Sequence, residues 1–525
     1  MKSAIKLLLW LFGAAIVLLG TSLVWLAGFF EPSDYRDEIA QWVAERTGYH
    51  FVIEGTVSVG FEHQPVRGFF VDIGVRDVEL TRVAQIPGEQ QLHLSVLDFS
   101  ADLGDLFASA RGAPLAGKGR FDVVDADLRK LLANSEVNWD AFTPQAFRSV
   151  SATGDFLVSG DTLSLTDLEV SMDGTQISGN LEIENLSADP AFHFDLNVPS
   201  LHLENLLQLS AQGPFDGLIL LNLPAILVAQ SEVTGLLKIG TLQSGGVIMS
   251  DVVMPLRAHG GVIVSSPITA DFYGGEARID TVLRVDGALL DFRTHQQISQ
   301  CRLGELLSDL ELTGLIEARG SLSAKLAFSG VDKASRIQSA RAVIEFAADQ
   351  GRIKGLDLAN LIEQLGRSAV GITDGSIGES AFTSLGDIRA TLRVEDGLLI
   401  NEDLAFQAGG LEVRGRGALA LQSEQLDYRI SLALNNRELA SVLPPPFNSG
   451  MGMIVLPLRI SGQWHAPSLM IDMPRMLQLQ FQAAMGGGSG LKTPPVDARA
   501  VRLAKDLDAE LAQALRGEPD EAANQ

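Results

Sequence analysis

Residues Thr383–Leu434, TSLGDIRATLRVEDGLLINEDLAFQAGGLEVRGRGALALQSEQLDYRISLAL, decide the fold. Apolar and polar side chains alternate through this stretch, and Asp396-Gly397 and further glycines interrupt it. A period of two places successive side chains on opposite faces of a strand, and Asp-Gly is typical of a tight turn between two strands. We therefore predict consecutive antiparallel strands that have one apolar face and one polar face.

The apolar face of these predicted strands is the candidate functional surface. Its members are Ile388, Leu392, Val394, Leu411, Val413, Leu426, Tyr428, Ile430 and Leu432. Their polar neighbours, such as Arg393 and Arg429, are expected on the opposite face. If the sheet curls with its apolar face inward, these side chains line a groove that can hold acyl chains.

The same pattern recurs along the chain. Ala152–Asn185 parallels Ile388–Leu421, because each reads as strand, turn and strand with glycines between. At about 4.8 Å per strand, roughly 20–25 such strands would extend to on the order of 100 Å. We predict a mainly β fold, in which an N-terminal transmembrane helix precedes an elongated, curled, groove-like antiparallel sheet. The expected helices are few: Leu201–Leu209, Cys301–Leu310, Asp357–Leu365 and Val496–Arg516.

An uncharged run, Leu7–Phe30, precedes the strands. As a helix, its 24 residues would span about 36 Å, enough for a hydrocarbon core of about 30 Å. A cleaved signal peptide is the alternative, but its apolar region usually has only about 7–15 residues. Trp10 and Trp25 lie toward the two ends, as interfacial anchors do. We predict an uncleaved anchor that includes Leu7, Trp10, Trp25 and Phe30.

The charges around this run predict its orientation. Lys2 and Lys6 precede it and Glu31 follows it, so the positive-inside rule keeps the N-terminus in the cytoplasm and exports the remaining chain. We predict residues 1–30 as the cytoplasmic N-terminus and anchor, and 31–80 as a helix with strands. Residues 81–230 are a divergent middle β region, 231–480 a β-meander, and 481–525 a flexible linker, a helix and an acidic tail.

The composition excludes several classes of function. With 40 basic and 65 acidic residues the net charge is −25, whereas a nucleic-acid partner requires a basic surface. The single cysteine, Cys301, excludes an internal disulfide and a cysteine-based metal site. The chain has no HExxH, GxSxG, Walker or calcium-loop motif. We therefore expect no enzyme activity, no catalytic residue, no metal and no cofactor.

Several segments, in order behind one apolar run, resemble the AsmA family of Gram-negative inner-membrane proteins. The segments that carry the resemblance are Glu31–Val59, Ile268–Asp280, Leu312–Gly330, Ala340–Leu358 and Thr383–Leu434. The middle of the chain, about residues 80–230, matches only in general character. The resemblance implies a single-pass inner-membrane protein with a periplasmic body and a role in outer-membrane biogenesis.

The resemblance also implies partners. One expectation is a protein that binds or moves phospholipid along an apolar groove of its sheet. The alternative is a periplasmic scaffold whose open sheet edges bind strands of outer-membrane proteins or other envelope proteins. The sequence does not separate these two expectations. A third, an anchored hydrolase, has no catalytic constellation to support it.

Overall fold

The computed structural model describes residues 49–64, 68–82, 92–105, 116–131, 142–186, 189–206, 232–310, 316–349, 351–357, 377–409, 411–435, 453–464, 466–484 and 497–516. The chain forms two compact units, Met1–Ile263 and Val264–Gln525. The predicted anchor, with Leu7, Trp10, Trp25 and Phe30, lies outside the described residues. Among the residues that are described, no helix is both long and apolar enough to cross a membrane.

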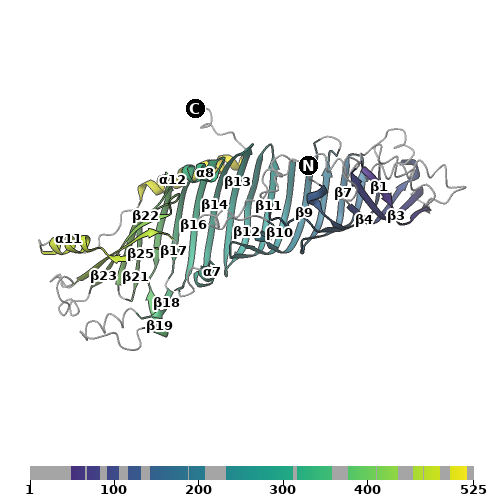
Figure 1. Ribbon diagram of the computed structural model, residues 1–525. Coiled ribbons are helices and arrows are strands. Elements are labelled where there is room, and N and C mark those ends of the chain that lie inside the picture. Colours follow the sequence, from purple (N-terminus) through teal and green to yellow (C-terminus); the bar gives the residue numbers. More distant parts are fainter. Residues whose placement is uncertain are drawn as a thin grey trace, which may run out of the picture. The chain divides into compact units, whose positions relative to one another are not determined.

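In its described residues the first unit is a sheet with two short helices (Figure 1). Its strands are β1 (Tyr49–Ile53), β2 (Val57–Gln64), β3 (Gly68–Arg82), β4 (Leu92–Asp102), β5 (Ala116–Ala126), β6 (Val150–Ser159), β7 (Thr162–Met172), β8 (Thr175–Glu184), β9 (Ala191–His202), β10 (Glu232–Ser244) and β11 (Val247–His259). The helices are α4 (Leu128–Leu131) and α5 (Leu203–Leu206). The next strand, β12 (Val262–Phe272), contains the boundary between the two units.

Neighbouring strands of the first unit pair in chain order, with one departure from the prediction. β1 and β2 both pair with β3, and each later strand up to β9 is antiparallel to the one before it. β10, however, is parallel to β9, so the prediction of a purely antiparallel sheet was wrong here. A parallel pair requires a long crossover, and residues 203–231 between the two strands are enough for one.

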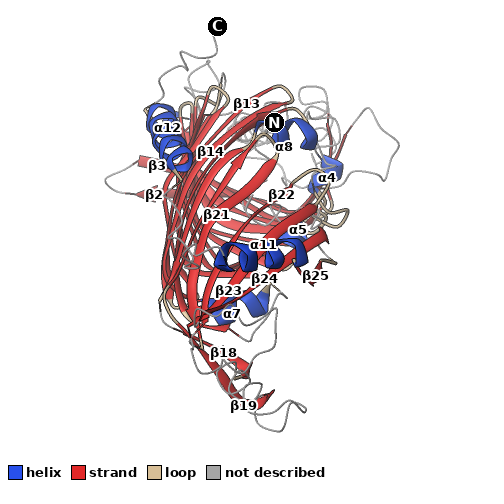
Figure 2. Ribbon diagram, turned by 90° about the vertical axis from the view of Figure 1, so that its left-hand side faces the viewer, coloured by secondary structure: helices blue, strands red, loops and turns tan. Residues whose placement is uncertain are grey.

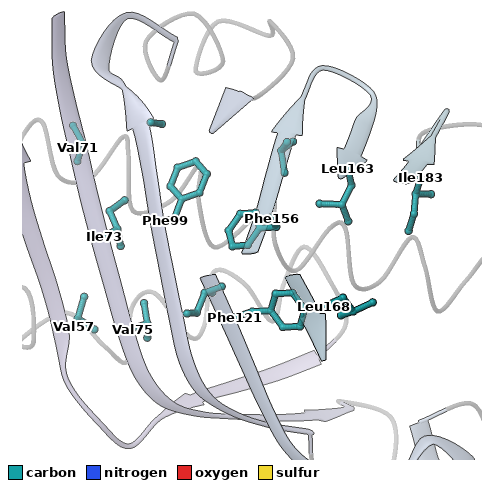
Figure 3. Close-up of a cluster of buried hydrophobic side chains, with 13 residues drawn as sticks. Val57, Val71, Ile73, Val75, Phe99, Phe121, Phe156, Leu163, Leu168 and Ile183 are labelled. Atoms are coloured by element: carbon teal, nitrogen blue, oxygen red, sulfur yellow. The ribbon is translucent and has the colours of Figure 1, made fainter. Parts of the chain in front are cut away.

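The core of the first unit lies on one face of its sheet (Figure 3). Phe99, Gly119 and Phe156 are register partners on β4, β5 and β6. The two rings stack with centroids 6.3 Å apart and an interplanar angle of 12°. A side chain on Gly119 would overlap the ring of Phe156 and the carbonyl group of Asp98. The glycine therefore lets the two rings close over the strand between them.

The second unit contains the stretch with which the sequence argument began. Its strands are β13 (Gly275–Asp286), β14 (Leu289–Arg302), β15 (Ile316–Glu317), β16 (Arg319–Gly330), β17 (Arg341–Ala348), β18 (Gly351–Leu356), β19 (Ile377–Leu385), β20 (Ile388–Glu395), β21 (Leu398–Ala408), β22 (Leu411–Ala420), β23 (Gln425–Asn435), β24 (Met453–Gln463) and β25 (Ser468–Ile471). Its described helices are α7 (Leu303–Asp309), α8 (Lys333–Ser339), α11 (Met473–Ala484) and α12 (Ala498–Leu515).

The sheet of the second unit is antiparallel in all its described pairings and is not closed. From β13 the order is β14, β16, β17, β20, β21, β22, β23, β24 and β25. The side strands β15, β18 and β19 join one another, and β19 meets β21 at a single pair of residues. Figure 2 shows that these strands curve and that α12 lies on the outer side of the curve.

The helices differ from the predictions in two places. β9 continues to His202, so the helix predicted at Leu201–Leu209 begins at Leu203, and the structure describes it to Leu206. Cys301 lies in β14, opposite Gly320, and α7 begins after it at Leu303. In both cases strand pairing extends the alternating pattern past the predicted helix start. Most of the helix predicted at Asp357–Leu365 lies outside the described residues.

The helix predicted near the C-terminus packs against the sheet of the second unit. α12 matches the predicted helix, and its buried side chains pack on Ala327 of β16 and Val343 of β17. α11 occupies residues that we placed partly in the meander, which we ended at residue 480. Asp472 accepts a hydrogen bond from the backbone N–H of Arg475 over 3.1 Å, and this cap starts the helix.

Candidate functional site: the apolar face of the second unit

The structure places all nine predicted surface residues on one face of the sheet of the second unit. They are Ile388, Leu392, Val394, Leu411, Val413, Leu426, Tyr428, Ile430 and Leu432, and they come from β20, β22 and β23. Two register rows show this arrangement. One row joins Leu392 through Asn401 and Gly417 to Tyr428, and the other joins Val394 to Leu426.

The exposure of these side chains divides them into two groups. Val394, Leu411 and Val413 are buried. The remaining six, among them Leu392 and Ile430, are half-buried. A closed core would bury all of them, whereas a flat exposed face would leave most of them in water. Their intermediate exposure fits an apolar lining that is partly open.

A polar network crosses this apolar face, and sequence reasoning missed most of it. The Tyr428 hydroxyl donates to Asn401 Oδ1 over 2.6 Å. The Asn401 side-chain amide donates to the carbonyl oxygen of Thr391 at 3.0 Å and to Asp403 Oδ1 at 2.9 Å. Burial, followed by the nearby Asp403 carboxylate, raises the pKa of Tyr428. A side chain at Gly415 would overlap the Tyr428 ring, so glycine there admits the ring onto the sheet.

A bulge in β21 explains why the alternation of the sequence did not reveal this network. The register with β22 shifts between Asn401 and Leu404, so β21 has one extra residue there. The side chains that follow the bulge therefore change face relative to a regular strand. Asp403 then accepts a hydrogen bond from the backbone N–H of Thr391 over 2.7 Å. Because Asn401 is only 5% exposed, the network is a fixed polar point in an otherwise apolar surface.

We expect Tyr428→Phe to lower the free energy of unfolding of the second unit by about 1–3 kcal/mol, because Asn401 Oδ1 loses its donor in a buried place. Urea unfolding followed by hydrogen exchange of peptides from β20 to β23 measures the change. Arg429→Gln, at the next position on the opposite face, is the control and should change it little. Equal stability of Tyr428→Phe and the native chain would show that the network contributes nothing.

The opposite face of the sheet is polar, and α12 lies on it across β14, β16 and β17. Lys325 Nζ donates to Asp508 Oδ2 over 2.6 Å. The Arg341 guanidinium donates one hydrogen bond to each carboxylate oxygen of Glu510, over 2.9 and 2.8 Å. The Glu510 carboxylate raises the pKa of Arg341, which partial burial opposes. These ion pairs fix the C-terminal helix across β14, β16 and β17.

Arg393, which we expected on the polar face, lies there but is only 4% exposed. Its Nε donates to Asp497 Oδ2 over 3.1 Å. Asp497 also caps α12, because its other oxygen accepts from the backbone N–H groups of Arg499 and Ala500. Burial works to raise the pKa of Asp497, but the bonds from Ala500 and Arg393 outweigh it, so the pKa is lowered.

His295 lies on the polar face as the register partner of Lys325, and we expect it to make the stability of the second unit depend on pH. Burial lowers the pKa of His295, Lys325 lowers it further, and Asp508, Asp280 and Glu345 oppose the shift. The unfolded chain therefore takes up this proton first as the pH falls below the ordinary value of 6.5. The stability that neutral His295 contributes is complete above that pH and is lost below it.

We accordingly expect the free energy of unfolding to fall more in the native chain than in His295→Gln when the pH is lowered from about 7.5 to about 5.5. The urea midpoint of the second unit, measured at several pH values for both chains, tests this difference. His259→Gln changes an exposed histidine and serves as the control. Parallel profiles for the native chain and His295→Gln would contradict the assignment.

Other candidate chemistry is sparse. Cys301 is a free, buried thiol whose pKa is raised by burial. In the part of the chain that the structure describes, no three His, Cys, Asp or Glu side chains are placed to hold a metal ion. The first unit has a hollow of about 810 Å³ lined by β2 to β7. Arg120 in this lining is paired with Asp155 at 2.9 Å.

Comparison with known proteins gives one family. The model of the AsmA family matches residues 225–404, which include β10 to β20 and most of β21. This match confirms the resemblance drawn from the sequence. No curated protein and no solved structure matches the chain.

Proposed function

Residues 225–404 match the model of the AsmA family, and from this premise we propose that the chain is a cell-envelope protein that binds or moves phospholipid along its apolar sheet face. In this proposal the protein is held in the inner membrane by Leu7–Phe30 and its body lies in the periplasm. It contributes to outer-membrane biogenesis without catalysis, metal or cofactor.

One observation carries the proposal. The second unit has an apolar face on one side of an open, curved sheet (Figure 2), and six of the nine side chains of this face are half-buried, not buried. The C-terminal helix occupies the other, polar face. Acyl chains gain free energy on such a surface because apolar area leaves water, at about 25 cal/mol per Å². The Tyr428–Asn401 network lies within this face, where it can contact the polar part of a lipid.

Photo-crosslinking tests the proposal. A photo-reactive residue at Leu392 or Ile430 should capture phospholipid, and the same residue at Arg429 should not. Arg429 is a matched control because it neighbours Ile430 and faces the opposite side. Mass spectrometry of the adducts identifies the lipid. Equal capture on both faces, or no capture at Leu392 and Ile430, would refute the proposal.

A scaffold for outer-membrane proteins is the second candidate, and the sheet edges favour it. Within the described ranges β2 pairs only with β3, and β25 pairs only with β24. Such edges can accept a further strand. Unfolded β-barrel precursors that still co-purify after deletion of residues 1–30 would favour this function. If no such precursor co-purifies and a photo-reactive residue at Leu392 still captures phospholipid, the lipid-binding function is favoured instead.

A further inference from the structure

An exposed apolar patch lies at the C-terminal end of the sheet of the second unit. Ile471 of β25 is 43% exposed, and Met473 and Leu477 of α11 are 49% and 58% exposed. We call these three residues the β25–α11 patch. Figure 1 shows α11 directly beyond β25, beside the last strands of the unit. Long apolar side chains grouped in this way on a surface indicate an interaction site.

The patch is held on a fixed support. Met476 of the same helix is 4% exposed, and the backbone N–H of Met476 donates to the carbonyl of Asp472 over 2.9 Å. Asp472 is in turn bonded through its backbone N–H to the carbonyl of Pro457 in β24. Met473 and Leu477 are four residues apart, so both lie on the same side of the helix. The helix therefore presents its exposed apolar side chains in one direction.

The charge of this region differs from that of the whole chain. Between Ser468 and Ala484 only Asp472 and Arg475 are charged, so their sum is zero, whereas the chain carries −25. Asp472 is also occupied as a helix cap. A second copy of so acidic a chain would be repelled at long range. An anionic membrane would repel it in the same way, but a zwitterionic lipid surface would not.

The patch is continuous with the candidate site. Ile471 is the register partner of Leu458, and Leu458 is the partner of Ile430. The apolar row therefore runs from the proposed lipid-binding face to the edge strand that precedes α11. A lipid that moves along this face would leave the sheet at the patch.

We propose that the β25–α11 patch binds to a zwitterionic lipid surface, with Met473 and Leu477 inserted at the boundary between headgroups and acyl chains. An amphipathic helix that lies in this boundary buries its apolar side there and keeps its polar side in water. The proposal rests on the proposed function only in taking that surface as the source or destination of the lipid. The contact itself needs no occupied sheet face.

Site-directed fluorescence tests the contact on the full chain, carried in phosphatidylcholine nanodiscs. An environment-sensitive thiol probe is attached to Leu477→Cys, because the native Cys301 is buried and reacts poorly. Added phosphatidylcholine vesicles should raise the emission severalfold, and nitroxide-labelled lipids in those vesicles should quench it. Val331→Cys, at a site that is 55% exposed before α8, is the control and should not respond.

A charge variant provides the second measurement. Met473→Glu with Leu477→Glu should weaken capture of the vesicles about tenfold or more, since two apolar side chains lose their burial. Val331→Glu should leave capture unchanged. The proposed membrane contact is refuted if the double variant captures vesicles as well as the native chain does, or if the probe at Leu477 responds no more than the probe at Val331. A response that depends on protein concentration without vesicles, and that nitroxide-labelled lipids in the nanodiscs do not quench, would also refute it, in favour of self-association.

These outcomes are separable from those of the proposed function. Lipid capture at Leu392 without any vesicle response at Leu477 would support the lipid-binding face and refute the membrane contact of the patch. A vesicle response at Leu477 without lipid capture at Leu392 would support the membrane contact and refute the lipid-binding face.

Discussion

Phe156→Ala is expected to lower the free energy of unfolding of the first unit by about 3–5 kcal/mol. Phe156 is 2% exposed and stacks with Phe99 across Gly119. Because Gly119 has no side chain, the strand beneath the ring cannot fill the space that the ring leaves. Urea unfolding of the full chain, followed by hydrogen exchange of peptides from β4 to β7, measures the loss.

Leu157→Ala is the matched control for this prediction. Leu157 is the next residue of β6, it points to the opposite face, and it is 50% exposed. Its truncation should cost less than about 1 kcal/mol, because much of its apolar area already lies in water. If Phe156→Ala and Leu157→Ala destabilise the unit equally, the stacked pair is not the anchor of this core.

Arg393→Ala is expected to destabilise the second unit by about 3–5 kcal/mol, as the loss of one partner from a buried ion pair does. The side chains of Arg393 and Asp497 are 5% and 10% exposed, so the Asp497 carboxylate would remain in a poorly hydrated place without its guanidinium. Asp497 also begins α12, and the substitution should therefore loosen that helix. Faster hydrogen exchange throughout Ala498–Leu515 is the signature.

Arg429→Ala removes an exposed arginine from the same face and is the control. It should leave exchange in α12 at the native rate. Restoration of slow exchange in Arg393→Ala by a second change, Asp497→Asn, would show that the unpaired charge causes the loss, because the amide still caps the helix. Native exchange in Arg393→Ala itself would show that the helix is held by its apolar contacts alone.

The two faces of the second unit thus differ in what covers them. The polar face binds α12 through Arg393, Lys325 and Arg341, and this contact supports the strands from behind. The apolar face keeps its partly accessible lining. The division explains how a chain at −25 can be rich in apolar residues, since acidic and apolar side chains are sorted to opposite sides of the same strands.

The sequence by itself determined which side chains share a face. Ile388, Leu392 and Val394 alternate with polar neighbours, and a period of two is a property of the strand alone. The C-terminal helix was predictable for the same reason, since its apolar spacing is local. The match over residues 225–404 agrees with segments that were recognisable from the sequence.

Only the tertiary structure decided what joins segments that lie far apart in the chain. Arg393 and Asp497 are separated by 104 residues, and no local pattern specifies that contact. The parallel pairing of β9 with β10 and the meeting of Tyr428 with Asn401 depend on register between strands, and the second also depends on the bulge in β21. Alternation determines the face of a residue, but register determines its partner, because a shift along a strand changes every partner it has.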